Sequence, residues 1–169
     1  MKAHFASFAR YNAWANRRLY AAASQIDDAQ RRSDQGAFFK SLHGTLNHLL
    51  VTDVIWMARL RGIPGPSWTL DHVAHDDFEE LRAAREAQDA DIVQWIDALP
   101  ESDILATTLS YTRVSSPEPI VQPMAEALAH VFNHQTHHRG HCHMILTRLT
   151  GTAPELDLLF YQREAKAAA

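Results

Sequence analysis

Two histidines one helical turn apart are the residues best suited to chemistry in this sequence. His134 and His138 lie in the segment VFNHQTHHRG, residues 131–140. In an α-helix, positions i and i+4 share a face, so both imidazoles project to one side. Such a pair needs one more ligand from a neighbouring element to make a three-histidine metal site with an open coordination position. His48, in the segment TLNHLL, is the best candidate for that ligand. The pattern therefore predicts metal-assisted chemistry.

Ordinary structural roles compete with this interpretation. A single histidine on a mostly apolar face, such as His48, is usually a hydrogen-bonded core residue, and a histidine-rich helix can carry a surface cluster or a purely structural polar network. Cys142, one turn beyond His138, would suit a soft metal. A lone cysteine in an apolar seam is, however, usually a small buried hydrophobe. The i, i+4 pair favours the metal interpretation.

The helix that carries the pair has a recognisable apolar face. At about 100° per residue, four side chains cluster on it: Val131, Cys142, Ile145 and Leu149. His138 falls inside this arc and His134 at its edge, whereas His137 lies on a flank. The angular position of His48 is less decisive. It is about a quarter-turn from the centre of the main apolar stripe of its own helix, formed by Phe38, Leu42, Leu49, Trp56 and Leu60.

Composition excludes several classes of protein. The chain has 169 residues, enough for one domain over residues 1–169, and a formal net charge of −4 argues against non-specific nucleic-acid binding. No apolar run approaches the roughly 20 residues of a membrane span. The N-terminal residues begin an amphipathic pattern and lack the apolar segment of a signal peptide. A single cysteine excludes an internal disulfide, so we expect a reducing, cytoplasmic location.

Apolar periodicity predicts an all-α fold. Helices are expected at about residues 2–26, 38–61, 76–99 and 122–149, with a short fifth helix at about 154–166 packing on the others. About fourteen residues separate the second and third helices, more than antiparallel neighbours usually need, so these two should run in the same direction. Residues 106–112 have strand-like character, and the residues Ser115, Ser116 and Pro117 suit the turn of a small hairpin before the fourth long helix. The simplest solution is a four-helix bundle.

Four segments resemble the DinB family of damage-inducible-like proteins. They are YNAWAN (11–16), LNHLLVTDVIW (46–56), HQTHHRG (134–140) and LDLLFY (156–161). The resemblance implies an up-down-down-up bundle that is commonly a homodimer, and a divalent metal (Zn, Ni or Fe) at His48, His134 and His138. Four aromatic residues of the first helix, more than one seam requires, would supply dimer contacts: Phe5, Phe8, Trp14 and Tyr20. One departure is His141, where the family usually has glutamine, which makes either this imidazole or water a candidate for the last coordination position.

The resemblance also implies an activity. Members of the family include thiol-dependent transferases and isomerases, so we expect transfer of a low-molecular-weight thiol onto a small electrophile. A metal-dependent hydrolase and a non-catalytic metal- or ligand-binding stress protein are the alternatives. No residue is assigned as general base: His141, Asp53 and Tyr111 are candidates, and Asp53 and Arg59 are expected at the surface.

Overall fold

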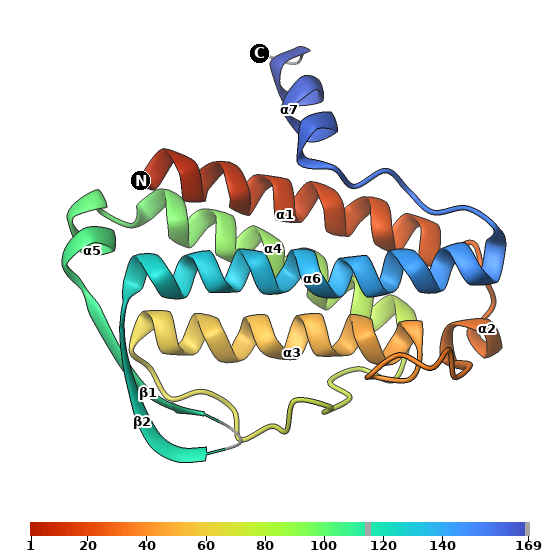
Figure 1. The fold of residues 1–169 in the computed structure, drawn as a ribbon, viewed down its shortest axis with the longest axis horizontal. Coiled ribbons are helices and arrows are strands. Elements are labelled where there is room, and N and C mark those ends of the chain that lie inside the picture. The colour runs from red at the N-terminus through yellow and green to blue at the C-terminus, as the bar shows by residue number, and fades with distance from the viewer. Residues whose placement is uncertain (114–115, 168–169) are drawn as a thin grey trace.

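Four long helices form the body of the protein. The computed structural model describes residues 1–113 and 116–167 and contains α1 (Lys2–Ala23), α3 (Leu42–Arg61), α4 (Phe78–Ala98) and α6 (Met124–Thr150) as its long helices. Three shorter helices accompany them, α2 (Asp28–Arg32), α5 (Glu101–Ala106) and α7 (Leu158–Ala167). In Figure 1, α1 and α6 run in one direction, and α3 and α4 run in the other. The all-α, up-down-down-up bundle is therefore confirmed.

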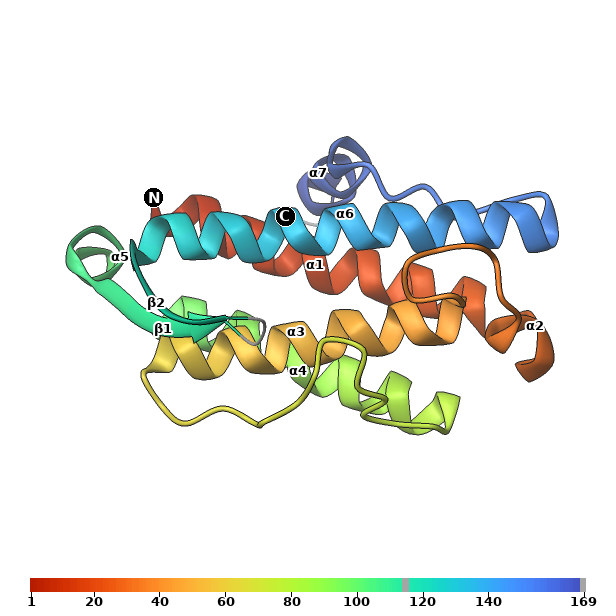
Figure 2. The ribbon, with the colours of Figure 1, turned by 60° about the horizontal axis from the view of Figure 1, so that its bottom comes forward.

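The parallel arrangement of α3 and α4 is visible in three contacts. Residues farther along α3 contact residues farther along the segment that leads into and includes α4. The contacts are Asn47–His75 (3.0 Å), Asp53–Arg85 (2.8 Å) and Arg61–Asp91 (2.7 Å). The connection over residues 62–77 passes back along the bundle beside α3, which Figures 1 and 2 both show. We call this connection the strap. Its length is what allows two successive helices to start at the same end.

The second long helix begins four residues later than the periodicity predicted. Ser41 is its N-cap, and the Ser41 side chain accepts a hydrogen bond from the backbone N–H of Gly44. Lys40, just before it, has a left-handed φ of 64°, which interrupts any helix arriving from Phe38. Phe38 was expected in the buried stripe, and this was wrong: its side chain is 85% exposed, in a loop.

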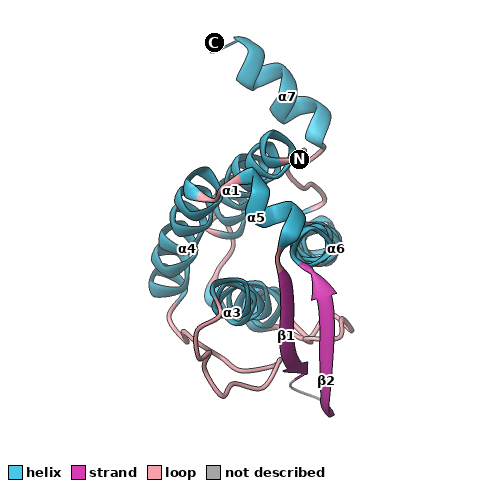
Figure 3. Ribbon diagram, turned by 90° about the vertical axis from the view of Figure 1, so that its left-hand side faces the viewer, coloured by secondary structure: helices cyan, strands magenta, loops and turns pink. Residues whose placement is uncertain are grey.

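A hairpin precedes α6, as expected. Strands β1 (Thr108–Arg113) and β2 (Ser116–Pro123) pair antiparallel, with Thr108 opposite Pro123 and Tyr111 opposite Ile120. Figure 3 shows this hairpin beside α3 and α6. The turn was predicted at Ser115 to Pro117, and Ser115 lies outside the described residues. The short helix α5 before the hairpin was not predicted.

The aromatic side chains of α1 are mostly enclosed by the chain itself. Phe5 and Tyr20 are buried in the core between the long helices. Trp14 is covered by α7, and its indole N–H donates a hydrogen bond to the Glu164 carboxylate of that helix over 2.7 Å. The expectation that Phe5, Trp14 and Tyr20 form surplus surface for a dimer was therefore wrong, whereas Phe8 is partly exposed. Among the described residues, no helix has the length and apolar character needed to cross a bilayer.

Candidate metal centre

The three predicted histidines meet between α3 and α6. Nε2 of His48, from α3, lies 3.2 Å from Nε2 of His138 and 3.4 Å from Nε2 of His134, both from α6. One ring nitrogen of each residue lies within 4.8 Å of those of the other two. His48 and His138 are buried, whereas His134 is partly exposed, so the cluster has an open side.

These nitrogens fit a divalent transition metal. Ligands at about 2.0–2.1 Å in a tetrahedral arrangement have nitrogens about 3.3–3.4 Å apart, close to the separations found from His48. Imidazole suits Zn, Ni and Fe alike, so the donor set does not select one of them. Three neutral ligands also leave the charge of the ion uncompensated.

The protonation state of the cluster suits coordination. Nδ1 of His48 lies 2.7 Å from the carbonyl oxygen of Leu70, in the strap. A carbonyl only accepts, so the proton resides on Nδ1 and the lone pair of Nε2 faces the other two histidines. Burial, reinforced by the neighbouring histidines, lowers the pKa of His134 to about 4 and that of His138 to about 3. Neutral rings are the form that binds metal. Nδ1 of His138 is buried and has no hydrogen-bond partner in the described part of the chain.

Phe39 covers one side of the cluster. Its ring stacks on His48 with centroids 3.8 Å apart and meets His138 edge-on at 5.6 Å. The loop that carries Phe39 rests on the first turn of α3, where a Cβ on Gly44 would lie 2.3 Å from the Phe39 carbonyl oxygen. Only glycine permits that approach. No pattern in the sequence pointed to Phe39 or to the Leu70 carbonyl, because both act from loops.

Buried polar contacts fix the rotation of α6. Gln135 donates to the Leu49 carbonyl of α3 over 3.1 Å, and Arg139 donates to Asn12 and, at 3.5 Å, to Asn16 of α1. Gln135 and Arg139 each follow a histidine of the pair by one residue, about 100° around the helix, so these bonds fix the rotation that turns His134 and His138 toward His48. The two asparagines of the YNAWAN motif thus bind the arginine of the HQTHHRG motif.

Asp53 belongs to the core and not to the surface, so that expectation was wrong. It is 1% exposed and forms an ion pair with the equally buried Arg85, which also binds Asp89 at 2.8 Å. Burial disfavours charge on Arg85, but Asp89 and Asp53 outweigh it, and the pKa of Arg85 is raised overall. A carboxylate committed to this pair is not available as a general base. Arg59 is also only partly exposed.

The remaining histidines and the cysteine have different surroundings. His137 is exposed on the flank of α6, as predicted, and with His138 and His141 it forms a second group close enough to hold an ion. His141 is partly exposed beside His138, with ring centroids 5.1 Å apart. Cys142 is fully buried among apolar side chains, and burial raises the pKa of its thiol to about 12. The Cys142 thiol is in neither of the groups able to hold an ion among the described residues.

An open pocket of about 560 Å³ adjoins the covered side of the cluster. It is lined by the loop before α3 and by the strap, through Phe38, Phe39, Lys40, Leu70 and Val73 among others. Phe38, Leu70 and Val73 are exposed apolar side chains. The pocket therefore has an apolar surface that is separated from His48 by the ring of Phe39.

Comparison with known proteins agrees with this architecture. No curated protein matches the chain. The sequence profile of the DinB family matches residues 1–168, which include all four long helices and the three converging histidines. Metal binding is a general property of DinB-like proteins, and the chain belongs to the DinB family.

Proposed function

We propose that the protein is a divalent-metal-dependent transferase that joins a low-molecular-weight thiol to a small electrophile. The observation that carries the proposal is the convergence of three Nε2 atoms, from His48, His134 and His138, at a partly open site. A divalent ion held by them would lower the pKa of a bound thiol and supply a nucleophile at neutral pH.

The surroundings of the site suit this reaction. In thiol transfer, sulfur forms a bond to an electrophilic carbon, the leaving group departs with its electron pair, and the thiol proton passes to solvent. The open side of the cluster, at the partly exposed His134, gives the electrophile access to a thiol bound there. The cytoplasm expected from the single cysteine is where such thiols are kept reduced.

The test follows loss of a small electrophile, monobromobimane, with the metal-loaded protein and 2-mercaptoethanol. Loss that requires thiol, metal and His134 supports thiol transfer. If turnover of an ester substrate proceeds without thiol, the protein is instead a metal-dependent hydrolase. Stoichiometric metal binding with no turnover of either substrate means that the protein is a non-catalytic metal-binding protein.

A further inference from the structure

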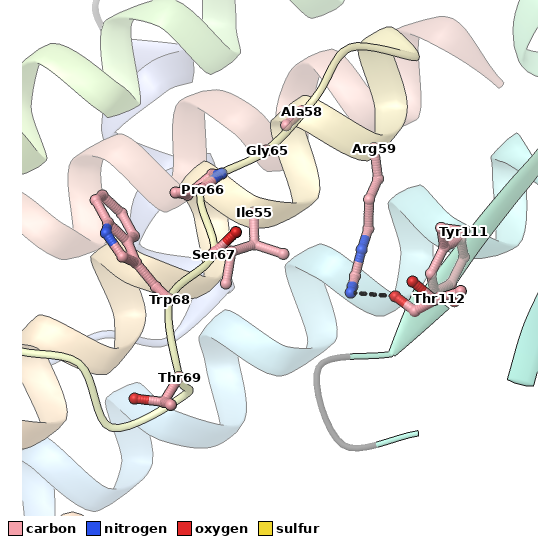
Figure 4. Close-up of a pocket in the computed structure, with 10 residues that line it drawn as sticks. All are labelled: Ile55, Ala58, Arg59, Gly65, Pro66, Ser67, Trp68, Thr69, Tyr111 and Thr112. Atoms are coloured by element: carbon pink, nitrogen blue, oxygen red, sulfur yellow. Dashed lines mark hydrogen bonds between the residues drawn. The ribbon is translucent and has the colours of Figure 1, made fainter. Parts of the chain in front are cut away.

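A second pocket lies farther along α3, between this helix, the strap and the hairpin. It has a volume of about 550 Å³, within the range of small-molecule sites. Its lining includes Ile55 and Arg59 of α3, Ser67 and Thr69 of the strap, and Tyr111 of β1. Figure 4 shows Arg59 on the hairpin side of this space and Ser67 beside Ile55 on the strap side. We call it the strap pocket.

Arg59 is held in place inside the strap pocket and makes one side-chain hydrogen bond to the described residues. Its guanidinium carbon lies 4.8 Å from the Trp56 ring centroid and 4.5 Å from that of Tyr111. One nitrogen donates to the Thr112 carbonyl over 2.9 Å. A guanidinium carries five N–H donors in a rigid fork, so this one bond leaves the fork able to take a second oxygen ligand.

No carboxylate of the described residues forms an ion pair with Arg59. Its neighbour on the same helix, Arg61, is bound by Asp91 at 2.7 Å, and most other arginines that line the bundle are likewise paired. The described residues that line the strap pocket also include no carboxylate. Partial burial lowers the pKa of Arg59, since the charged form is incompletely solvated there. An incoming anion would relieve this desolvation.

The electrostatics of the pocket favour a singly charged anion. Arg59 is in the last turn of α3, where the helix ends at Gly62 and its unpaired carbonyls carry partial negative charge. One cation next to a helix C-terminus matches a carboxylate better than a doubly charged phosphate. The planar fork of arginine also fits the two oxygens of a carboxylate.

Two series of neighbouring residues connect the strap pocket to the histidine cluster. One is the strap, in which Thr69 lines the pocket and Leu70 accepts the hydrogen bond from His48. The other is a series of aromatic rings. The ring centroid of His134 lies 5.7 Å from that of His130, and the His130 centroid lies 4.9 Å from that of Trp56, whose ring contacts the Arg59 guanidinium.

Helix geometry sets the length of a ligand that reaches both places. Ile55 and Arg59 follow His48 by seven and eleven residues, so all three are on one face of α3. Eleven residues correspond to about 16 Å along the axis. Side chains on a helix lean toward its N-terminus, so the long Arg59 side chain reaches back into this interval and leaves a span of about three extended residues.

We infer that the strap pocket binds the thiol substrate of the proposed reaction through a carboxylate held by Arg59, and that this thiol is an extended molecule of roughly tripeptide length. Only the role of the substrate's thiol group rests on the proposed function. Binding of its carboxylate by Arg59 does not depend on that function, so the two are tested in separate experiments.

The binding experiment uses metal-loaded protein and S-methylglutathione, a tripeptide analogue with carboxylates but no free thiol. Calorimetry should show that Arg59→Gln weakens binding about tenfold or more, since a hydrogen bond to a charged group is lost. Arg59→Lys should bind with intermediate affinity, and Arg61→Gln, in which the altered arginine is already paired with Asp91, should bind as the unaltered protein does. The dimethyl ester of the probe should bind weakly to every variant.

The kinetic experiment compares glutathione with 2-mercaptoethanol, a thiol that has no carboxylate. Arg59→Gln should raise KM for glutathione at least about tenfold more than it raises KM for 2-mercaptoethanol, because only glutathione has a carboxylate contact to lose. Circular dichroism and the thermal midpoint check that the variant is folded. No binding of S-methylglutathione to the unaltered protein, or equal affinity in Arg59→Gln, would overturn the inference. If the probe binds through Arg59 but no thiol is turned over, the proposed function fails and the carboxylate site stands.

Discussion

The ring of Phe39 lies nearly flat on the imidazole of His48, with centroids 3.8 Å apart and planes inclined by 20°. Together with the hydrogen bond from Nδ1 to Leu70, this stacking fixes the direction in which Nε2 of His48 points. Both contacts come from loops that rest on α3. His48, whose orientation was the least certain from the sequence, is therefore held by loops, which have no periodic pattern.

Gly44→Ala tests whether the loop that carries Phe39 is needed at the cluster. The new methyl group would lie 2.3 Å from the Phe39 carbonyl oxygen, so the loop has to move and the stacking on His48 is lost. We expect a loss of about 1–3 kcal/mol in the free energy of unfolding, measured in urea, and weaker metal binding in calorimetry.

Gly140→Ala is the matched control, because a Cβ there meets nothing within 4 Å. It sits inside α6, so alanine should stabilise the protein by about 0.5–1 kcal/mol. If Gly44→Ala behaves like Gly140→Ala in both measurements, the loop is not a support of the metal site.

Asp53→Ala tests the buried ion pair between α3 and α4. Removing this carboxylate leaves the buried Arg85 with Asp89 as its remaining charged partner, so we expect a loss of about 2–3 kcal/mol in the free energy of unfolding. Asp91→Ala breaks the corresponding pair with Arg61 at the surface and should cost about 1 kcal/mol or less. Equal losses in the two variants, by urea denaturation, would contradict this account.

The sequence predicted the long helices and their directions because each depends on local signals. Gly62 ends α3 in the left-handed conformation, and Pro100 follows the end of α4. The long strap could be read as a parallel connection from its length alone. The i, i+4 spacing of His134 and His138 likewise determined their common face.

Other features depend on partners that are distant in sequence. Nearly all of α3 is buried, because α2, α4, α6 and the hairpin pack around it. Its apolar pattern therefore did not single out the face of His48. Asp53 was expected outside because carboxylates usually are, and its partner Arg85 lies on another helix. The start of α3 was misplaced because the cap at Ser41 decides it, and not the apolar residues before it.

Cys142 should be inert in the folded protein. Burial raises the pKa of its thiol to about 12, so the reactive thiolate is scarce at neutral pH, and the sulfur is also out of reach of reagents. Labelling with Ellman's reagent at pH 7.5 should detect essentially no thiol until the protein is unfolded in guanidinium, and then one per chain. Rapid labelling without denaturant would show that the core around Cys142 opens.

We also predict a homodimer in which α7 is covered by the second copy. This ten-residue helix contacts α1 through Leu158 and Tyr161 but has no buried residue among those described, extends away from the bundle in Figure 1, and exposes Leu159. A helix so short is marginal without further packing. Light scattering should give twice the chain mass, and Leu159→Lys should return the mass to one chain. Leu105→Lys, on exposed α5, serves as the control. A single-chain mass for the unaltered protein at all concentrations would refute the prediction.

Metal titration of four alanine variants tests whether the ion binds between α3 and α6. His138 belongs to both groups able to hold an ion, so the other members discriminate between them. We predict one divalent ion per chain in the unaltered protein. His48→Ala and His134→Ala should each lower the affinity by at least about a hundredfold, more than the loss of a supporting contact would cause. His137→Ala and His141→Ala should retain the ion. Retention in His48→Ala and His134→Ala, with loss in His137→Ala and His141→Ala, would place the metal on the outer face of α6 and contradict the site described between α3 and α6.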